Sequence, residues 1–204
     1  MRILITAGPT REPIDQVRFF SNRSSGSMGI AIAQAAQAAG HETTLLLGPV
    51  CLPAPAGVHT ERFSSCADLE KALKAQFEKC DVLIMAAAVA DYRMASPLVG
   101  KVERGANLTL ILAPTPDLVA ACAKRKRSDQ KVVAFALEES QRLNERAQEK
   151  MKRKGVDAIV ANPLETMNAA DIQGTLMWAD GRSVSPGKVS KAQFAKWLVG
   201  ELGK

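Results

Sequence analysis

Continuous apolar runs and segments with helical spacing alternate along the first half of the chain. Three apolar runs are typical of strands buried on both faces of a parallel sheet: residues 2–6, 42–47 and 81–86. Helical spacing predicts one helix from about Ser25 to Ala39, closed by Gly40, and another that begins at the capping pair Ser65 and Asp68. The βαβαβ order predicts right-handed crossovers and therefore an α/β fold, Rossmann-like and doubly wound, with a mainly parallel sheet.

The second half of the chain continues this alternation and adds a hairpin. Four further elements are predicted: helices at residues 118–126 and 141–154, and strands at residues 131–137 and 157–161. A turn at Asp180 and Gly181 joins residues 174–178 and 182–184 into a hairpin, and Ser190 caps a final helix. No internal repeat, low-complexity segment or linker separates these elements. We therefore predict a single domain over residues 1–204.

Residues 101–112 interrupt the alternation of strands and helices. They alternate weakly around Gly105, Ala106 and Asn107, which indicates a β-hairpin arm rather than another crossover. Three leucines of this arm have no obvious partner in the chain: Leu108, Leu110 and Leu112. Because exposed strand edges tend to pair with another chain, we predict that the arm joins two copies into a homodimer.

Composition narrows the classes of function. The chain has 204 residues, 47% hydrophobic and 24% charged, which is ordinary for one sizeable globular domain. Its net charge of +6 favours an anionic ligand. Four cysteines without CxxC or His-linked spacing argue against a zinc site, and two histidines leave little for histidine catalysis. Without a signal peptide or a membrane span of ~20 apolar residues, we expect a cytoplasmic protein with no membrane partner.

The polar stretch at residues 21–29 lies between the first strand and the first helix. Ser24 and Ser25 can cap the first helical amides, and Gly26 lets another group approach the backbone, so the helix N-terminus can form an anion site. Arg18 and Asn22, just upstream, can act on a ligand that is held there by phosphate. A capped helix after a polar loop explains the same residues equally well.

Two further groups of residues carry candidate chemistry, and each has a simpler explanation. The small residues that begin at Ala86 let a ligand approach the carboxyl end of a strand, and Asp91 follows them directly. The alternative is the start of an Ala-rich helix, with Asp91 simply solvated. Lys150 and Lys154 lie on one helix face and can bind one polyphosphate, or they are simply a solvated helix end. Lys101 is most simply a solvated lysine.

Two other functions fit the sequence less well. An NAD-dependent oxidoreductase lacks support, because no GxGxxG motif follows the first strand and no acidic residue ends the second. A nucleic-acid-binding module would draw on the two basic runs at residues 124–127 and 150–154. However, aromatic residues make up only 4% of the chain, and no RNP, KH or helix-turn-helix pattern is present, so we predict no nucleic-acid partner.

Several motifs together resemble phosphopantothenate–cysteine ligase, in its bacterial, CTP-using form that is commonly the C-terminal half of a bifunctional coenzyme A biosynthesis protein. The motifs are ILITAGPTREPID at residues 3–15, SNRSSG at 21–26, AAAVADYR at 86–93, TPD at 115–117, FA at 135–136, and Lys150 and Lys154 followed by Asp157. The first motif is highly specific. The likeness covers residues 1 to about 162, and the C-terminal hairpin and helix are similar only in outline.

The resemblance implies a Rossmann-like domain that dimerises partly through its arm, and a reaction in two steps. The carboxylate of 4′-phosphopantothenate attacks CTP, which gives an acyl-cytidylate and pyrophosphate, and the amine of L-cysteine then displaces CMP. CTP is thus the implied co-substrate, with Mg²⁺. The decarboxylase domain of the bifunctional protein is absent from this sequence, so the chain is either a free-standing enzyme or an excised half of such a protein. A separate phosphopantothenoylcysteine decarboxylase is a candidate partner.

The resemblance also implies roles for individual residues. Asn22 would stabilise the acyl oxygen as its charge develops, and Lys101 would close over the site from a loop. Three residues would orient phosphopantothenate: Arg18, Ala87 and Ala88. The remaining residues would bind the nucleotide: Ser24, Gly26, Gly29, Ala86, Asp91, Pro116, Asp117, Leu118, Val119, Phe135, Lys150 and Lys154. Asp91 is also the implied magnesium ligand.

The sequence departs from the family pattern at several positions. Ser27 stands where a lysine commonly follows Ser-Ser-Gly, which removes a cation near the phosphates. Leu137 and Glu139 replace the usual small and hydroxylic residues after Phe135 and Ala136. These departures affect the pocket rim more than the reaction class. We expect CTP to be preferred over ATP, although the residues alone do not decide this.

Overall fold

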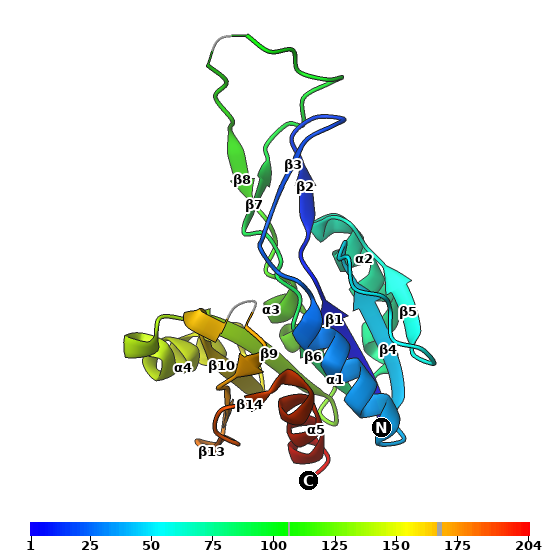
Figure 1. Cartoon of the computed structure of the whole chain (residues 1–204), viewed down its shortest axis with the longest axis vertical. Coiled ribbons are helices and arrows are strands. Elements are labelled where there is room, and N and C mark those ends of the chain that lie inside the picture. The colour runs from blue at the N-terminus through cyan, green and yellow to red at the C-terminus, as the bar shows by residue number, and fades with distance from the viewer. Residues whose placement is uncertain (106, 167–168) are drawn as a thin grey trace.

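An eight-stranded sheet forms the centre of the molecule (Figure 1). The structure is a computed structural model and describes residues 1–105, 107–166 and 169–204. The sheet contains β1 (Arg2–Ala7), β4 (Glu42–Leu47), β5 (His59–Arg62), β6 (Val82–Met85), β9 (Lys131–Glu138), β10 (Ala158–Pro163), β12 (Thr175–Trp178) and β13 (Ser183–Val184). Their order across the sheet is β13-β12-β10-β9-β6-β1-β4-β5.

The sheet is doubly wound, as predicted. All neighbouring pairs from β5 to β10 are parallel, and β12 and β13 add an antiparallel edge. From β1 the chain first builds towards β5 and then returns to build from β6 to β10, so the winding direction reverses between β1 and β6. In such sheets, ligands bind at the carboxyl ends of the strands beside this reversal. The strand β5 was not predicted, because its half-exposed HTER sequence at the sheet edge contains no apolar run.

Helices cover both faces of the sheet, and this explains the unbroken apolar runs. The helices α1 (Ser27–Ala38) and α5 (Lys191–Leu202) pack on one face together with Ile3 and Ile5. The opposite face is covered by three helices: α2 (Cys66–Gln76), α3 (Leu118–Arg125) and α4 (Leu143–Lys154). Leu4 points to that side, so alternate residues of one strand are buried in two different cores. None of the described helices has the length and apolar character needed to cross a membrane.

Most helix ends follow the predicted signals. Ser65 and Asp68 form a reciprocal capping box at the start of α2, and Ser190 does the same with Gln193 at α5. Gly155 ends α4 in the left-handed conformation. Three short 3₁₀ turns complete the helical elements: η1 (Phe77–Lys79), η2 (Ser140–Arg142) and η3 (Leu164–Thr166). The start predicted at residue 141 for α4 therefore belongs to a separate turn.

Two hairpins rise together from the carboxyl side of the sheet and form one arm (Figure 1). One pairs β2 (Arg11–Pro13) with β3 (Phe19–Ser21), inside the stretch predicted to be a loop. The other pairs β7 (Tyr92–Met94) with β8 (Leu112–Pro114). The hairpin predicted within residues 101–112 is therefore wrong in its strands, because the described residues between 101 and 111 form none, and Ala106 lies outside the described residues. A separate small pair joins β11 (Asp171–Ile172) to β14 (Val189–Ser190).

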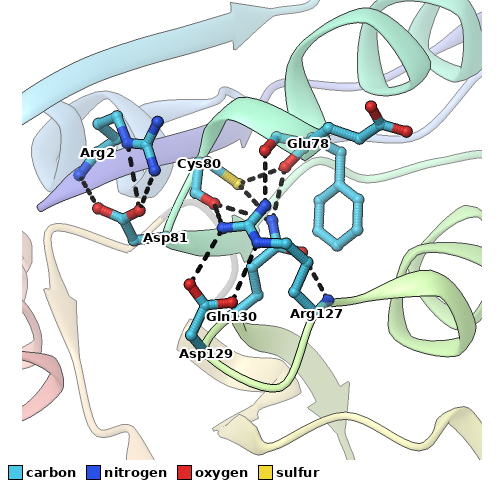
Figure 2. Close-up of polar contacts among 8 residues, drawn as sticks. Arg2, Glu78, Cys80, Asp81, Arg127, Asp129 and Gln130 are labelled. Carbon is cyan, nitrogen blue, oxygen red and sulfur yellow. Dashed lines mark hydrogen bonds and ion pairs between the residues drawn. The ribbon is translucent and has the colours of Figure 1, made fainter.

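A polar network ties together the amino ends of the central strands, opposite the arm. Figure 2 shows Arg2 binding the carboxylate of Asp81, with Nη2 2.6 Å from Oδ1, and this hydrogen bond is the main reason why the pKa of Asp81 is lowered. Gln130 donates to the carbonyls of Phe77 and Cys80 at 2.7 and 2.8 Å. These contacts hold β1, β6 and β9 together at their amino ends, opposite the carboxyl ends at which such sheets bind ligands.

Candidate functional site

A cavity of about 800 Å³ lies at the carboxyl ends of β6, β9 and β10. It is beside the point where the winding direction reverses, the position at which doubly wound sheets bind ligands. Every residue predicted for the site lines this cavity except Arg18 and Lys101. The lining includes Asn22, Ser24, Gly26, Gly29, Ala86, Ala87, Ala88, Asp91, Pro116, Asp117, Leu118, Val119, Phe135, Lys150 and Lys154.

The N-terminus of α1 forms one wall of the cavity. Gly26 is the N-cap residue, with φ +73°, and contributes no side-chain cap. The hydroxyl of Ser25 accepts weakly from the Ser27 amide at 3.4 Å, so the predicted serine capping reaches only the first helical residue. Within the described part of the chain, the amides of Met28 and Gly29 have no acceptor. These amides and the helix dipole favour an anion in the cavity.

Gly29 has a packing reason for being glycine. A Cβ at this position would lie 2.5 Å from the Cβ of Ala7 and 2.9 Å from the Thr6 carbonyl oxygen. The first turn of α1 therefore sits directly on the backbone of β1, which holds its amides close to the strand end. The third glycine of dinucleotide-binding motifs has the same function in helix–strand packing.

The small residues after β6 are held in an extended conformation, so the alternative of a helix start is wrong. The amide of Ala88 donates to the Gly8 carbonyl at 2.9 Å, and the Ala88 carbonyl accepts from the Thr10 amide at 3.2 Å. The hydroxyl of Thr10 also accepts from the Ala90 amide at 3.0 Å. The two motifs that the sequence separates by about 80 residues thus form one backbone ledge beside the cavity.

Asn22 is bound to this ledge. Its Nδ2 donates to the carbonyl oxygens of Ala88 at 3.0 Å and Val89 at 3.2 Å. The side chain is exposed at the cavity wall. Asn22 is therefore held in a defined place by the strand end that was predicted to bind substrate.

Lys150 and Lys154 project from the last turns of α4 to the cavity wall, and each is paired with a carboxylate. Lys150 Nζ lies 2.8 Å from Glu138 Oε1, and Lys154 Nζ lies 2.7 Å from Asp117 Oδ2. Burial by itself raises the pKa of both carboxyl groups, but the hydrogen bonds and charges of the lysines lower the pKa of each below its ordinary value. An anionic ligand therefore has to compete with two ionised carboxylates for these lysines.

Arg18 and Lys101 lie on the arm, outside the cavity lining. Arg18 binds Asp15, with Nη1 2.9 Å from Oδ2, and its Nη2 donates to the Val102 carbonyl at 2.9 Å. Asp15 is only 6% exposed, and its pKa is lowered chiefly by the Val17 amide, with further bonds from the amides of Arg18 and Val102. Lys101, next to this cluster, is exposed. Arg18 thus holds the arm together, which the resemblance did not imply.

Sequence reasoning did not assign several polar residues of the cavity, among them Lys191 and Asn162. Lys191, the first residue of α5, donates from Nζ to Ser27 Oγ at 3.0 Å. Asn162 at the end of β10 is 8% exposed, and its Oδ1 has no donor among the described residues. No local sequence pattern predicts that either residue lies in the site. The cap at Ser190 indicates only that a helix begins at Lys191. In the part of the chain that the structure describes, no three His, Cys, Asp or Glu side chains are grouped to hold a metal ion.

The chain is similar to a known family and to several known sequences. The family of the DNA/pantothenate metabolism flavoprotein C-terminal domain matches residues 1–204. The coenzyme A biosynthesis bifunctional protein CoaBC of Escherichia coli K12 is 41% identical over 194 residues, which is 91% of this chain and 48% of that protein. A protein of an unknown prokaryotic organism, named cysteine/cysteine sulfinic acid decarboxylase, is 45% identical over 170 residues, 82% of this chain and 47% of that one. The chain thus spans about half the length of the curated relatives it matches.

Solved structures share the complete fold. The C-terminal domain of a CoaBC protein superposes with a TM-score of 0.85 at 34% identity, covering 98% of this chain and 93% of that one. The DNA/pantothenate metabolism flavoprotein of Streptococcus pneumoniae has a TM-score of 0.84 at 22% identity, covering 100% of this chain and 98% of that one. A Cab2 mutant in complex with phosphopantothenate-cysteine has a TM-score of 0.81 at 18% identity, covering 98% and 84%. The last two likenesses concern the fold alone.

Proposed function

The chain belongs to the family of the DNA/pantothenate metabolism flavoprotein C-terminal domain, and from this we propose that it joins 4′-phosphopantothenate to L-cysteine in coenzyme A biosynthesis. One observation carries the proposal. The cavity at the winding reversal combines free helix-start amides, a ledge of small residues, and Lys150 and Lys154 of α4. These groups suit two phosphorylated substrates held side by side.

The proposed reaction needs positioning and charge neutralisation. A carboxylate oxygen of 4′-phosphopantothenate attacks the α-phosphorus of CTP, the bond to the β-phosphate breaks, and pyrophosphate leaves with the electron pair. The amine of cysteine then attacks the acyl carbon, the bond to CMP breaks, and the nitrogen loses a proton. The described lining contains no cysteine or histidine, so a covalent enzyme intermediate on either residue type has no candidate there.

Asn22 is the proposed donor to the acyl oxygen. Its fixed position on the ledge, bonded to the carbonyls of Ala88 and Val89, supports this role. To donate to the substrate, one N–H of the amide has to leave its carbonyl. Ala87 and Ala88 would orient phosphopantothenate, and Lys101 would approach the phosphates from the arm. Such closure is typical of loops that exclude water from a reaction.

Lys150 and Lys154 would bind the triphosphate by exchanging Glu138 and Asp117 for phosphate oxygens. Ser24 and Gly26 would line the phosphate path, while Phe135 and the residues at Pro116 to Val119 would surround the nucleoside. Mg²⁺ on nucleotides is usually held by one or two carboxylates, phosphates and water. Asp91, an exposed carboxylate of the cavity, fits that requirement, and the ion it would hold would neutralise phosphate charge.

The decisive assay measures pyrophosphate release with CTP or ATP in the presence of phosphopantothenate and cysteine. We expect release that depends on phosphopantothenate, and a higher kcat/KM with CTP. An ATP preference would restrict the assignment to the reaction class. No release with either nucleotide, or release of carbon dioxide from cysteine alone, would contradict the ligase and favour the chemistry named for the decarboxylase relative.

The partners are proposed on the same basis. A homodimer would form through the arm, and a phosphopantothenoylcysteine decarboxylase would be a further partner, because the full-length CoaBC relatives are named as bifunctional proteins. We also propose that the enzyme works in the cytoplasm, without nucleic-acid or membrane partners.

A further inference from the structure

A lysine from the far end of the chain reaches the N-terminus of α1. Lys191 begins α5, which packs beside α1 on the same face of the sheet (Figure 1). Its Nζ lies 3.0 Å from the hydroxyl of Ser27, the first residue of α1, although the two residues are 164 positions apart. Both residues line the cavity. The ammonium group of Lys191 in α5 therefore lies at the positive end of the α1 dipole.

Lys191 differs from the two lysines of α4 in its surroundings. Lys150 and Lys154 are each neutralised by a carboxylate. In the described parts of the chain, Lys191 makes no ion pair, and its printed hydrogen bond goes to a neutral hydroxyl. Burial therefore lowers the pKa of the Lys191 ammonium, with no opposing charge to restore it. A half-buried cation of this kind is stabilised when an anion enters the cavity.

Other groups in the cavity also lack partners. The amides of Met28 and Gly29, in the same first turn as Ser27, have no acceptor among the described residues. Asn162 is 8% exposed, lines the same cavity, and has an Oδ1 without a donor in the described structure. A half-turn of its amide would present Nδ2 instead, which is a donor. The cavity thus combines a cation, helix-start amides and a buried side-chain amide whose oxygen has no donor.

We propose that Lys191 binds a phosphate group of a substrate at the N-terminus of α1, together with the Met28 and Gly29 amides. The inference rests on the proposed ligase function, because that reaction supplies two phosphorylated ligands. The phosphate belongs either to the nucleotide or to 4′-phosphopantothenate. The amides and an ammonium bind either source by the same charge-assisted hydrogen bonds.

The test is direct binding by calorimetry, which needs no turnover. CTP, ATP and 4′-phosphopantothenate are titrated separately into the unaltered protein and into Lys191→Met, at low and high salt. We expect Lys191→Met to weaken one ligand by roughly tenfold or more and to reduce the salt dependence of its binding. The ligand that is weakened identifies the source of the phosphate. Lys191→Arg keeps the positive charge and should bind each ligand with nearly the affinity of the unaltered protein.

Two further variants separate charge from structure. Lys196→Met removes an exposed lysine of the same helix and should bind all ligands normally. Ser27→Lys combined with Lys191→Met returns a cation to the same place from α1, and it should recover most of the lost affinity. Failure of this rescue, or unchanged affinity in Lys191→Met, would overturn the inference while leaving the ligase intact. If the unaltered protein binds none of the ligands, the inference and the proposed function fall together.

Discussion

At the scale of single residues, several groups that could bind a substrate already have partners within the protein. Glu138 and Asp117 occupy the lysines of α4, and the Ala88 and Val89 carbonyls occupy Asn22. At Lys150, Lys154 and Asn22, a substrate therefore has to replace existing contacts. Each replacement can be tested by removing one of the competing groups.

Asn22→Ala removes the proposed donor to the acyl oxygen. We expect the barrier to rise by about 2.7–4 kcal/mol, as for a lost oxyanion donor, with nucleotide affinity changed much less. Single-turnover rates and equilibrium nucleotide binding measure the two effects separately. Normal turnover would remove Asn22 from the mechanism, whereas loss of nucleotide binding would assign it to the structure of the ledge.

Glu138→Gln removes the carboxylate that competes for Lys150. We expect nucleotide affinity at pH 7 to increase up to roughly fivefold, the range of a partly exposed ion pair. Calorimetric titration with CTP measures this increase. The control is Glu145→Gln, which alters an exposed glutamate of α4, the helix that carries Lys150, and should leave nucleotide affinity unchanged. Weaker binding in Glu138→Gln would show that the carboxylate orients Lys150 instead of competing for it.

The same pair predicts a dependence of stability on pH. Because the folded-state pKa of Glu138 is below the ordinary value of 4.5, the pair stabilises the fold above that value. This contribution is lost as the pH falls through the lowered pKa. Unfolding by urea should therefore show Glu138→Gln less stable by up to about 1 kcal/mol at pH 7, and equal to the unaltered protein at strongly acidic pH. A constant difference at all pH values would contradict this.

At the scale of elements, the arm is two hairpins, and the turn of the first is bound to residues 98–102 of the second. The Leu98 amide donates to the Ile14 carbonyl at 3.0 Å, and the buried Asp15 binds the Val102 amide at 3.1 Å. These bonds connect the turn of the first hairpin to the segment that carries Lys101. The position of Lys101 is thus controlled from residues more than eighty positions away.

Asp15→Asn should release this segment. An asparagine keeps one acceptor but places an N–H donor against other donors, so the bonds to the Val102 amide and Arg18 cannot all survive. We expect trypsin to cleave after Lys101 and Arg104 several times faster, with the sheet unaffected. Glu103→Gln, an exposed change in the same segment, is the control. Equal cleavage of both variants would show that Asp15 does not hold the segment.

At the scale of the whole molecule, the arm exposes apolar side chains far from the core. These are Val17, Phe19, Tyr92, Val99, Leu108, Ile111 and Leu112. Val99 is 98% exposed and Ile111 72% exposed, which is unfavourable for a free surface. A second copy of the chain that pairs with this arm would cover them.

Ile111→Asp should therefore convert a dimer into a monomer. Sedimentation at micromolar concentration is expected to show a dimer for the unaltered protein and a monomer for the variant. The variant should not dimerise because the interface would have to bury an unpaired carboxylate. Leu52→Asp changes another exposed apolar residue, outside the arm, and should stay dimeric. A monomeric unaltered protein with full ligase activity would contradict the homodimer.

The central architecture and about half of the described cavity lining could be predicted from the sequence. Buried parallel strands, capping boxes and the helix stop at Gly155 depend on residues within a few positions of one another, so local patterns reveal them. Ala86, Ala87 and Ala88 could be predicted because they directly follow β6 at the carboxyl edge of the sheet, whereas the family resemblance implied the other cavity residues. The reversal of winding lies beside β6, where doubly wound sheets bind ligands.

The tertiary structure was needed to place the strands of the arm, the edge strand β5 and the contacts between distant residues. The strand β5 and the hairpin strands are short and half-exposed, so they lack the apolar pattern of a buried strand. Arg18 became a structural contact because the Val102 segment packs against it. Lys191 reached Ser27 only because α1 and α5 cover the same face of the sheet. Contacts over such separations depend on packing, which local periodicity does not encode.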